Sequence, residues 1–154
     1  MKMRMILGML MAVGICGAQN LLENGDFTVQ FKRLATPVGW DMQCSGNCRM
    51  EVDKVVTYNG KPSLRIEIEG DGSKQWNWVC RTIKGAVGRG AYTISAMVKT
   101  EGLKDGALAY LSLNGYDNHG NRIMTNDSVQ KLTGTNDWTK ITYTVEKWSA
   151  AFRS

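Results

Sequence analysis

Residue types on which many catalytic and metal sites depend are scarce in this sequence. Its 154 residues include a single histidine, His119, and two prolines. One histidine limits triad chemistry, and no set of residues has the spacing of a known metal site. The sequence also lacks a nucleophile elbow and a phosphate-binding loop, and the glycines of residues 85–90 are in the wrong order for a dinucleotide-binding loop. These absences argue against the enzyme classes that rely on such groups.

No pair of carboxylates is clearly suited to glycoside hydrolysis. A glycosidase needs two carboxylates that flank the scissile bond at a defined separation. Glu67 and Glu69 share one face of a predicted strand, but we expect them to form a solvated surface. We therefore expect the chain itself not to be an enzyme.

The first 18 residues have the composition of a secretory leader. The basic residues Lys2 and Arg4 precede an apolar run that ends at Cys16, and small residues follow as far as Ala18. This run is too short to cross a bilayer as a helix. We expect cleavage after Ala18 and a secreted chain, either extracellular or periplasmic. A lipoprotein with Cys16 as the lipidated residue is the alternative, and the bulky Ile15 argues against it.

No basic cluster that could follow a phosphate backbone is left once the leader is removed. Losing Lys2 and Arg4 leaves 17 of the 19 basic residues against 14 acidic ones, so the net charge falls from +5 to +3. Nucleic acid is therefore not an expected partner. The remaining residues, 19–154, are enough for one domain with a substantial core.

Three cysteines follow the leader, and export favours disulfides. They are Cys44, Cys48 and Cys80, so at most one bond can form within the chain. Cys44 and Cys48 flank a tight-turn sequence, Ser45-Gly46-Asn47, and could face each other across a hairpin. In that case Cys80 is free. Alternatively, Cys80 pairs with one of the other two, if its strand lies alongside.

Short alternating runs of apolar and polar residues are the main structural signal after the leader. Four of them are residues 64–69, 92–99, 110–116 and 141–145, separated by turn sequences rich in glycine, asparagine and aspartate. No stretch of ten or more residues has a helical period. The pattern predicts an all-β fold, an antiparallel β-sandwich of jelly-roll type with roughly eight or nine strands.

The sequence stops soon after the last of these runs. Sandwiches of this kind usually close with a strand that pairs near the N-terminal one, and without it edge hydrogen-bonding groups stay open. We expect the C-terminal closing strand to be missing and the domain of residues 19–154 to be truncated. The tail of residues 147–152 is a poor substitute.

Trp76 and Trp78 are the most informative pair of side chains. They bracket Asn77, so in a strand both indoles leave by the same face. Val79 and Ile83 have the opposite parity, which we assign to the core. Two apolar rings on an exposed sheet face are costly in water unless something covers them, and a sugar ring is a suitable cover in a secreted β-protein. The competing interpretation buries the indoles and turns Val79 outward.

A second set of candidate binding residues alternates with leucines. Tyr110, Asn114 and Tyr116 share a face opposite Leu111 and Leu113, which we assign to the core. Aromatic rings stack on the C–H faces of sugars, while amide and hydroxyl groups bond to their rims. This stripe would be the floor of a groove if its sheet is concave. A solvated face with incidental tyrosines is the alternative.

Five motifs in a fixed order carry a resemblance to a known family. They are NLLENGDF at 20–27, PVGW at 37–40, YNGKPSLRI at 58–66, AYTISAMVK at 91–99 and LTGTNDWT at 132–139. This series resembles the carbohydrate-binding modules of families 4, 9 and 22, within the galactose-binding-like jelly rolls. It covers about residues 20–146. We interpret Trp40 and Trp138, which lie within these motifs, as packing residues.

The resemblance implies a non-catalytic module that holds a secreted polysaccharide-degrading enzyme on its substrate. Sugars would lie in a concave groove, stacked on Trp76 and Trp78, with Tyr110, Asn114 and Tyr116 contributing further contacts. The implied ligand is a polysaccharide or oligosaccharide of β-glucan or xylan type. A catalytic domain in a longer parent chain, a glycoside hydrolase, would be its partner.

The resemblance also implies a structural calcium ion near the N-terminal strand, although no cofactor is required for binding. Glu23 and Asp26 are the local candidate ligands. In the family an acidic residue commonly follows the Asn-Gly-Asp-Phe element, and this chain has Thr28 there. That difference weakens the calcium prediction.

A second function from a different class stays open. The same jelly roll could be a structural or adhesion domain that docks a neighbouring domain or a cell-surface protein. Trp76 and Trp78 would then be interface residues rather than sugar-binding ones. A tight protein partner without glycan retention would distinguish this function from the first.

Overall fold

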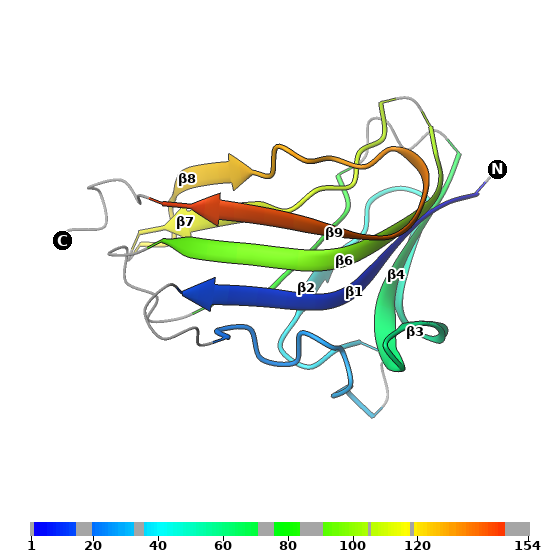
Figure 1. The fold of residues 1–154 in the computed structure, drawn as a ribbon, viewed down its shortest axis with the longest axis horizontal. Coiled ribbons are helices and arrows are strands. Elements are labelled where there is room, and N and C mark those ends of the chain that lie inside the picture. Colours follow the sequence, from blue (N-terminus) through cyan, green and yellow to red (C-terminus); the bar gives the residue numbers. More distant parts are fainter. Residues whose placement is uncertain are drawn as a thin grey trace.

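The computed structural model describes residues 2–14, 20–32, 36–70, 76–83, 91–104, 106–117 and 119–146. Over these residues the chain is all β, without a helix and with antiparallel pairing in every sheet, which confirms the fold class at that level. No helix in this part of the chain is long and apolar enough to cross a membrane. The strands are β1 (Lys2–Gly14), β2 (Asp41–Gln43), β3 (Cys48–Tyr58), β4 (Lys61–Glu69), β5 (Trp78–Cys80), β6 (Tyr92–Leu103), β7 (Ser112–Tyr116), β8 (Arg122–Asp127) and β9 (Gly134–Val145) (Figure 1).

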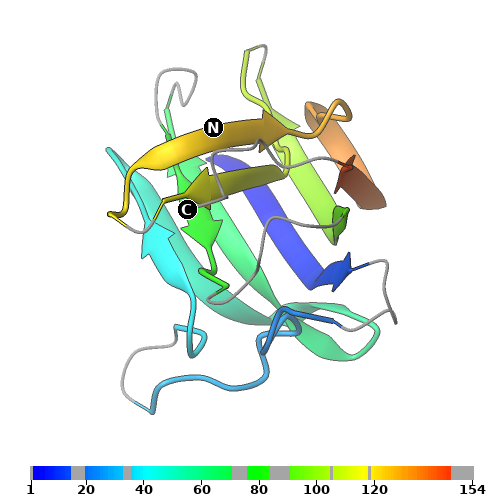
Figure 2. The same ribbon diagram turned by 90° about the vertical axis from the view of Figure 1, so that its left-hand side faces the viewer.

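The strands form one large sheet and two small ones. The large sheet has the order β3-β4-β1-β6-β9, and the small sheets are the pairs β2-β5 and β7-β8. β7 and β8 cross over one face of the large sheet (Figure 2). An isolated bridge between Ala109 and Leu132 lies just outside the β7-β8 pair. The sheets do not close into a barrel.

The segment with leader composition is the central strand of the large sheet. β1 pairs with β4 on one side and with β6 on the other (Figure 1). Met3, Ile6 and Leu7 are buried. Removal of residues 1–18 on export stays a prediction, and the cleavage site at Ala18 and the alternative lipidation site at Cys16 lie outside the described residues, as does the tail of residues 147–152.

The core contains the apolar members of the alternating runs. Leu64 and Ile66 on β4, Ala96 and Val98 on β6, and Ile141 on β9 are each at most 2% exposed. Their polar neighbours point to the opposite face, because successive side chains of a strand alternate. The apolar members of these runs therefore form the core.

A network of hydrogen bonds centred on Asn24 stabilises the segment before β2. The Asn24 side chain donates to the carbonyls of Val29 and Val38, at 2.8 and 3.0 Å, and accepts from the Val29 amide. The Trp40 indole donates to the Asn24 carbonyl at 3.0 Å and packs edge-on against the buried Phe27 ring. Trp40 is thus a packing residue, as predicted.

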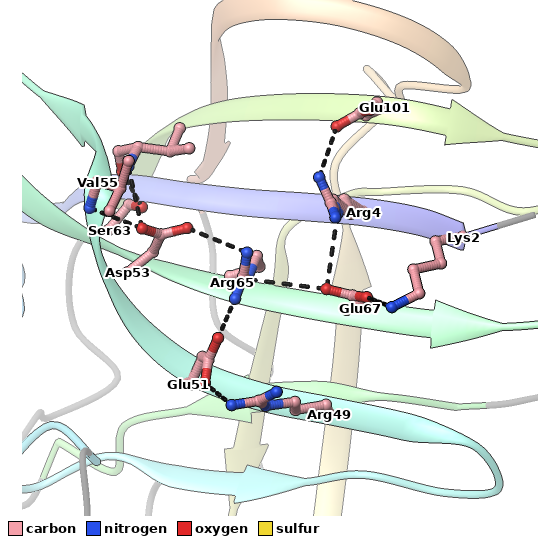
Figure 3. Close-up of polar contacts among 11 residues, drawn as sticks. Lys2, Arg4, Arg49, Glu51, Asp53, Val55, Ser63, Arg65, Glu67 and Glu101 are labelled. Atoms are coloured by element: carbon pink, nitrogen blue, oxygen red, sulfur yellow. Dashed lines mark hydrogen bonds and ion pairs between the residues drawn. The ribbon is translucent and has the colours of Figure 1, made fainter.

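The outer face of the large sheet carries a network of ion pairs (Figure 3). Glu67 lies at its centre and is only 8% exposed. Lys2 Nζ is 2.9 Å from Glu67 Oε1, Arg4 Nε is 3.5 Å from Oε2, and Arg65 Nε is 3.9 Å from Oε2. The hydrogen bond from Lys2 lowers the pKa of Glu67 although burial opposes it. The expectation that Glu67 belongs to a solvated surface is therefore wrong, because β1 covers it with cations.

Candidate functional site

The β2-β5 pair turns one row of side chains to the core and the other to solvent. Met42 and Val79 lie opposite each other and pack against the core. Gln43 and Trp78 also lie opposite each other, and both are exposed. The predicted parity of Val79 is therefore confirmed, and the interpretation that turns Val79 outward is wrong.

Both indoles of the Trp76–Trp78 surface, which we define as Gln43, Trp76 and Trp78, reach solvent. Trp76 is 75% exposed and Trp78 is 41% exposed. Trp40, by contrast, is 7% exposed within the core. A ring with this much free surface in water can contact a ligand without any rearrangement of the core.

Asn77, between the two tryptophans, turns inward and ties them to a neighbouring loop. Its Oδ1 atom accepts a hydrogen bond of 2.7 Å from the Ser45 amide. The Ser45 hydroxyl lies 3.2 Å from the Trp76 carbonyl and 3.3 Å from Asn77 Oδ1. These bonds tie the Asn77 side chain and the Trp76 carbonyl to the loop, so they restrain the backbone that carries the two indoles.

A disulfide closes the loop that contains Ser45. Cys44 and Cys48 are joined, with their Cα atoms 5.5 Å apart. Cys80 is free and lies opposite Asp41 in the β2-β5 pair. Burial, with the Asp41 carboxylate as a second cause, raises the pKa of the Cys80 thiol. A raised pKa keeps the thiol protonated at neutral pH, which makes Cys80 a weak nucleophile.

The stripe of polar and aromatic residues lies on the other small sheet. Asn114 and Tyr116 are exposed on one face of β7, opposite Thr125 and Arg122 of β8. Tyr116 is 52% exposed. Leu111, which precedes β7, is buried, and Leu113 packs against the core, as the alternation predicts.

Tyr110 differs from the other two members of its set. It lies before β7 and is half-buried, and Lys131 Nζ is 4.7 Å from the centre of its ring. Burial, and then the charge of Asp127, raises the pKa of the Tyr110 hydroxyl. One face of this ring is therefore occupied by a cation, which leaves Tyr110 a poorer stacking surface than Trp76.

The predicted binding residues fall into two groups rather than one. Trp76 and Trp78 belong to the segment of β5, whereas Tyr110, Asn114 and Tyr116 belong to that of β7. Among the described residues, no hydrogen bond or ring contact joins the two groups. Each group is therefore a separate candidate contact surface.

The two candidate calcium ligands have partners within the chain. Arg81 Nη2 donates to Glu23 Oε2 at 2.6 Å. Asp26 accepts from the Thr28 hydroxyl at 2.9 Å and lies 3.7 Å from Lys61 Nζ. Calcium takes six to eight oxygen ligands, and no group of three or more His, Cys, Asp or Glu gathers among the described residues. Glu23 and Asp26 therefore do not fit a calcium site by themselves.

The sequence did not reveal the polar residues around the tryptophans. Gln43 is opposite Trp78 only because two three-residue strands pair although their partners are at least 35 positions apart (78 − 43 = 35), and no local pattern reveals such a pairing. Asn77 has the same parity as the inward-facing Val79, and that parity was the signal that could have identified it as an anchor. Trp138 packs against Tyr58, with ring centres 5.3 Å apart, on the outer face of the large sheet.

The comparisons with known proteins identify no relative. A scan against protein-family models gives no match, and searches of curated proteins and of solved structures give none either. The site therefore has to be interpreted from its own geometry.

Proposed function

We propose that this chain is a non-catalytic carbohydrate-binding module and that Trp76 and Trp78 stack on sugar rings. The observation that carries the proposal is the exposure of two indoles two residues apart, one at the first residue of β5 and the other just before the strand. A large aromatic side chain left in water forgoes the stabilisation of burial, so two of them within three residues of the chain indicate a surface that is covered in use. A sugar ring offers the C–H face that an indole stacks on.

Polar groups beside the indoles support a sugar rather than a purely apolar ligand. Gln43 lies directly opposite Trp78, and its amide can both donate to and accept from hydroxyl groups. Asp41 is exposed on the same face of the β2-β5 pair. A flat ring flanked by an amide and a carboxylate is the combination that a sugar with hydroxyls at its rim requires.

The β7 group would provide a second contact region on a long glycan. Tyr116 offers an exposed ring and Asn114 an exposed amide. Tyr110 would contribute at most one ring face because Lys131 covers the other. A polymer with a β-glucan-like or xylan-like backbone could contact both groups.

The electrostatics favour binding over hydrolysis. A glycosidase needs one carboxylic acid with a raised pKa as its proton donor. In the full-length chain Glu67 has a lowered pKa and is paired with Lys2 and Arg4, and Arg65 is the cation that still faces it once residues 1–18 are removed. The free thiol of Cys80 has a raised pKa, which disfavours a covalent mechanism. These groups support a module without catalytic activity of its own.

We propose further that the module is a secreted jelly roll attached to a polysaccharide-degrading enzyme. The antiparallel sheets, the Cys44–Cys48 disulfide and the leader composition of residues 1–18 support export to an oxidising compartment. The ordered series of family motifs supports the jelly roll. Calcium is not needed in this account.

Affinity electrophoresis against a panel of soluble polysaccharides tests the proposal. The wild-type chain should be retarded by at least one β-glucan or xylan, and the Trp76→Ala/Trp78→Ala variant should not. Phe31→Ala is the matched control, because it removes a ring that is 52% exposed elsewhere on the surface. Equal retardation of the double variant and the control would remove the site assignment.

One observation favours the alternative, a structural domain that docks a protein. Val29 and Phe31 are 55% and 52% exposed and lie close together in the segment after the Asn24 turn. An exposed apolar pair of this kind also suits a protein interface. Mass photometry of the chain with its neighbouring domain, showing a stable complex without any glycan retention, would favour this function.

A further inference from the structure

The central strand of the large sheet is also the segment predicted to be removed on export. If cleavage follows Ala18, β4 and β6 lose the strand that lies between them. We propose that the position between β4 and β6 is a strand-acceptor site in the processed chain, and that it binds an extended segment of a partner protein.

The pairing of β1 shows which backbone groups the site offers to an entering strand. β1 pairs antiparallel with β4 from Lys2 to Leu7 and antiparallel with β6 from Arg4 to Gly14. Without β1 both neighbours present a row of unpaired N–H and C=O groups. Such facing edges bind an added strand through main-chain hydrogen bonds, while side-chain pockets select its sequence.

The inner face of the site requires apolar residues at alternate positions. Met3 and Leu7 are buried in the core cluster, and Met5 packs against it from the position between them. Across the sheet, Leu7 lies opposite Leu64 on β4 and Val98 on β6. An entering strand therefore needs three apolar side chains with a spacing of two.

The outer face of the site requires positive charge. Glu67 is nearly buried and is paired with Lys2 and Arg4, and Glu101 lies 3.4 Å from Arg4 Nη1. Glu69 lies 3.4 Å from Lys2 Nζ. With β1 gone, Arg65 at 3.9 Å is the cation that still faces Glu67. Burying an unbalanced carboxylate is costly, so a strand with basic residues at these positions is favoured.

One position of the site accepts only a very small residue. A Cβ atom added to Gly8 would lie 3.0 Å from the Trp138 ring, 3.0 Å from Tyr58 Cβ and 3.3 Å from Met97 Cβ. Tyr58 and Trp138 pack against each other on the outer face, so neither can move away freely. The strand that fits therefore follows the pattern of residues 2–8: two basic residues that alternate with apolar ones, an additional apolar residue at the buried Ile6 position, and then a glycine.

A separate polypeptide is the occupant that these observations favour. The other strands among the described residues already have places in the three sheets. A second copy of this chain would have to open one of its own sheets to donate a strand. A partner protein with a free segment of the stated pattern pays no such cost.

Strand exchange in the full-length chain tests the proposal. Residues 15–19 are replaced by a protease recognition sequence, and the purified chain is cut there. A fluorescent peptide with the sequence of Lys2–Gly14 is then added, and its incorporation is followed by anisotropy. We expect saturable incorporation, competed by unlabelled peptide. A Lys2→Glu/Arg4→Glu peptide should bind at least about tenfold more weakly, and a Gly8→Leu peptide should not bind measurably.

A charge-swapped chain and hydrogen exchange provide independent readouts. The Glu67→Lys/Glu101→Lys chain should prefer the charge-reversed peptide. Amides of β4 and β6 that face β1 should lose protection when the cut strand dissociates and regain it with peptide. The proposal is overturned if the cut chain keeps its own strand against excess peptide or binds both charge forms equally. Dimer formation, or amides that stay protected without any peptide, would also overturn it.

Discussion

Two regions of this molecule differ in which side chains they bury: one buries a charged group among partners, and the other leaves apolar rings exposed. On the outer face of the large sheet, the carboxylate of Glu67 is nearly buried and surrounded by cations. On the Trp76–Trp78 surface, two apolar rings are left in water beside few charges. In the first region opposite charges pair with one another, whereas in the second the apolar groups lack a cover.

The difference separates a region that stabilises the fold from one that is available for binding. Removing a member of the Glu67 network leaves partners without compensation, so the fold should lose stability. Removing an indole that is mostly exposed, such as Trp76, uncovers little surface, so stability should change less than ligand binding. Stability and binding measured on the same variants therefore distinguish the two regions.

The largest effect is expected from Trp76→Ala/Trp78→Ala. Each stacked indole should contribute on the order of 1–2 kcal/mol to glycan binding, so the double variant should lose about hundredfold in affinity. Its free energy of unfolding should fall by less than the binding energy, by about 1–2 kcal/mol, because Trp76 is 75% exposed and only Trp78, at 41%, covers part of its surroundings. Isothermal calorimetry and urea denaturation measure the two quantities. If the free energy of unfolding fell by more than the free energy of glycan binding, the two tryptophans would belong to the region that stabilises the fold.

The next largest effect is expected from Glu67→Gln. The neutral amide cannot balance Lys2, Arg4 and Arg65, so the free energy of unfolding of the full-length chain should fall by about 1–2 kcal/mol. Glycan affinity should stay at the wild-type value, since the network lies on a different sheet from Trp78. Glu69→Gln, at an exposed position, is the matched control and should change stability much less.

Acid should weaken the Glu67 network and leave the Trp76–Trp78 surface intact. Lys2 and its neighbours lower the pKa of Glu67 from the ordinary value of 4.5. The unfolded chain therefore takes up the proton at a higher pH than the folded one. The stabilisation is complete above the ordinary value and is lost as the pH falls below it towards the folded pKa. Urea unfolding from pH 7 to 3 should show this slope, and Glu67→Gln should flatten it.

A smaller effect is expected from Asn77→Ala. The variant loses the hydrogen bond to the Ser45 amide, which should reduce the free energy of unfolding by about 1 kcal/mol. Glycan affinity should fall several-fold, because the indoles stay but lose their positioning. Asn114→Ala is the control for removing an exposed amide without this anchor. Unchanged affinity in Asn77→Ala would show that the indoles need no anchor.

The alternation of apolar and polar residues in the sequence predicts which side chains of each strand face the core. The core positions Leu64, Val98 and Ile141, the inward parity of Val79 and the packing of Trp40 follow from residue pattern or motif. Each of these features depends on residues close in sequence, so a single sequence without homologues is enough to predict it.

Features that depend on distant pairing could not be predicted. The sequence does not reveal that Gln43 faces Trp78 or that Ser45 binds Asn77, because each contact joins segments more than 30 residues apart. The central place of β1 was missed for a different reason. Its apolar run matches a leader and a buried strand equally well, since both need the same residues.

The central claim is that Trp76 and Trp78 form the glycan-binding surface. The most direct test follows the indole N–H signals of the five tryptophans by NMR while a β-glucan or xylan oligosaccharide is added. The account predicts that the signals assigned to Trp76 and Trp78 shift in a saturable way, while that of the buried Trp40 stays in place. Saturable shifts confined to other residues, or no shift with any member of the panel, would contradict it.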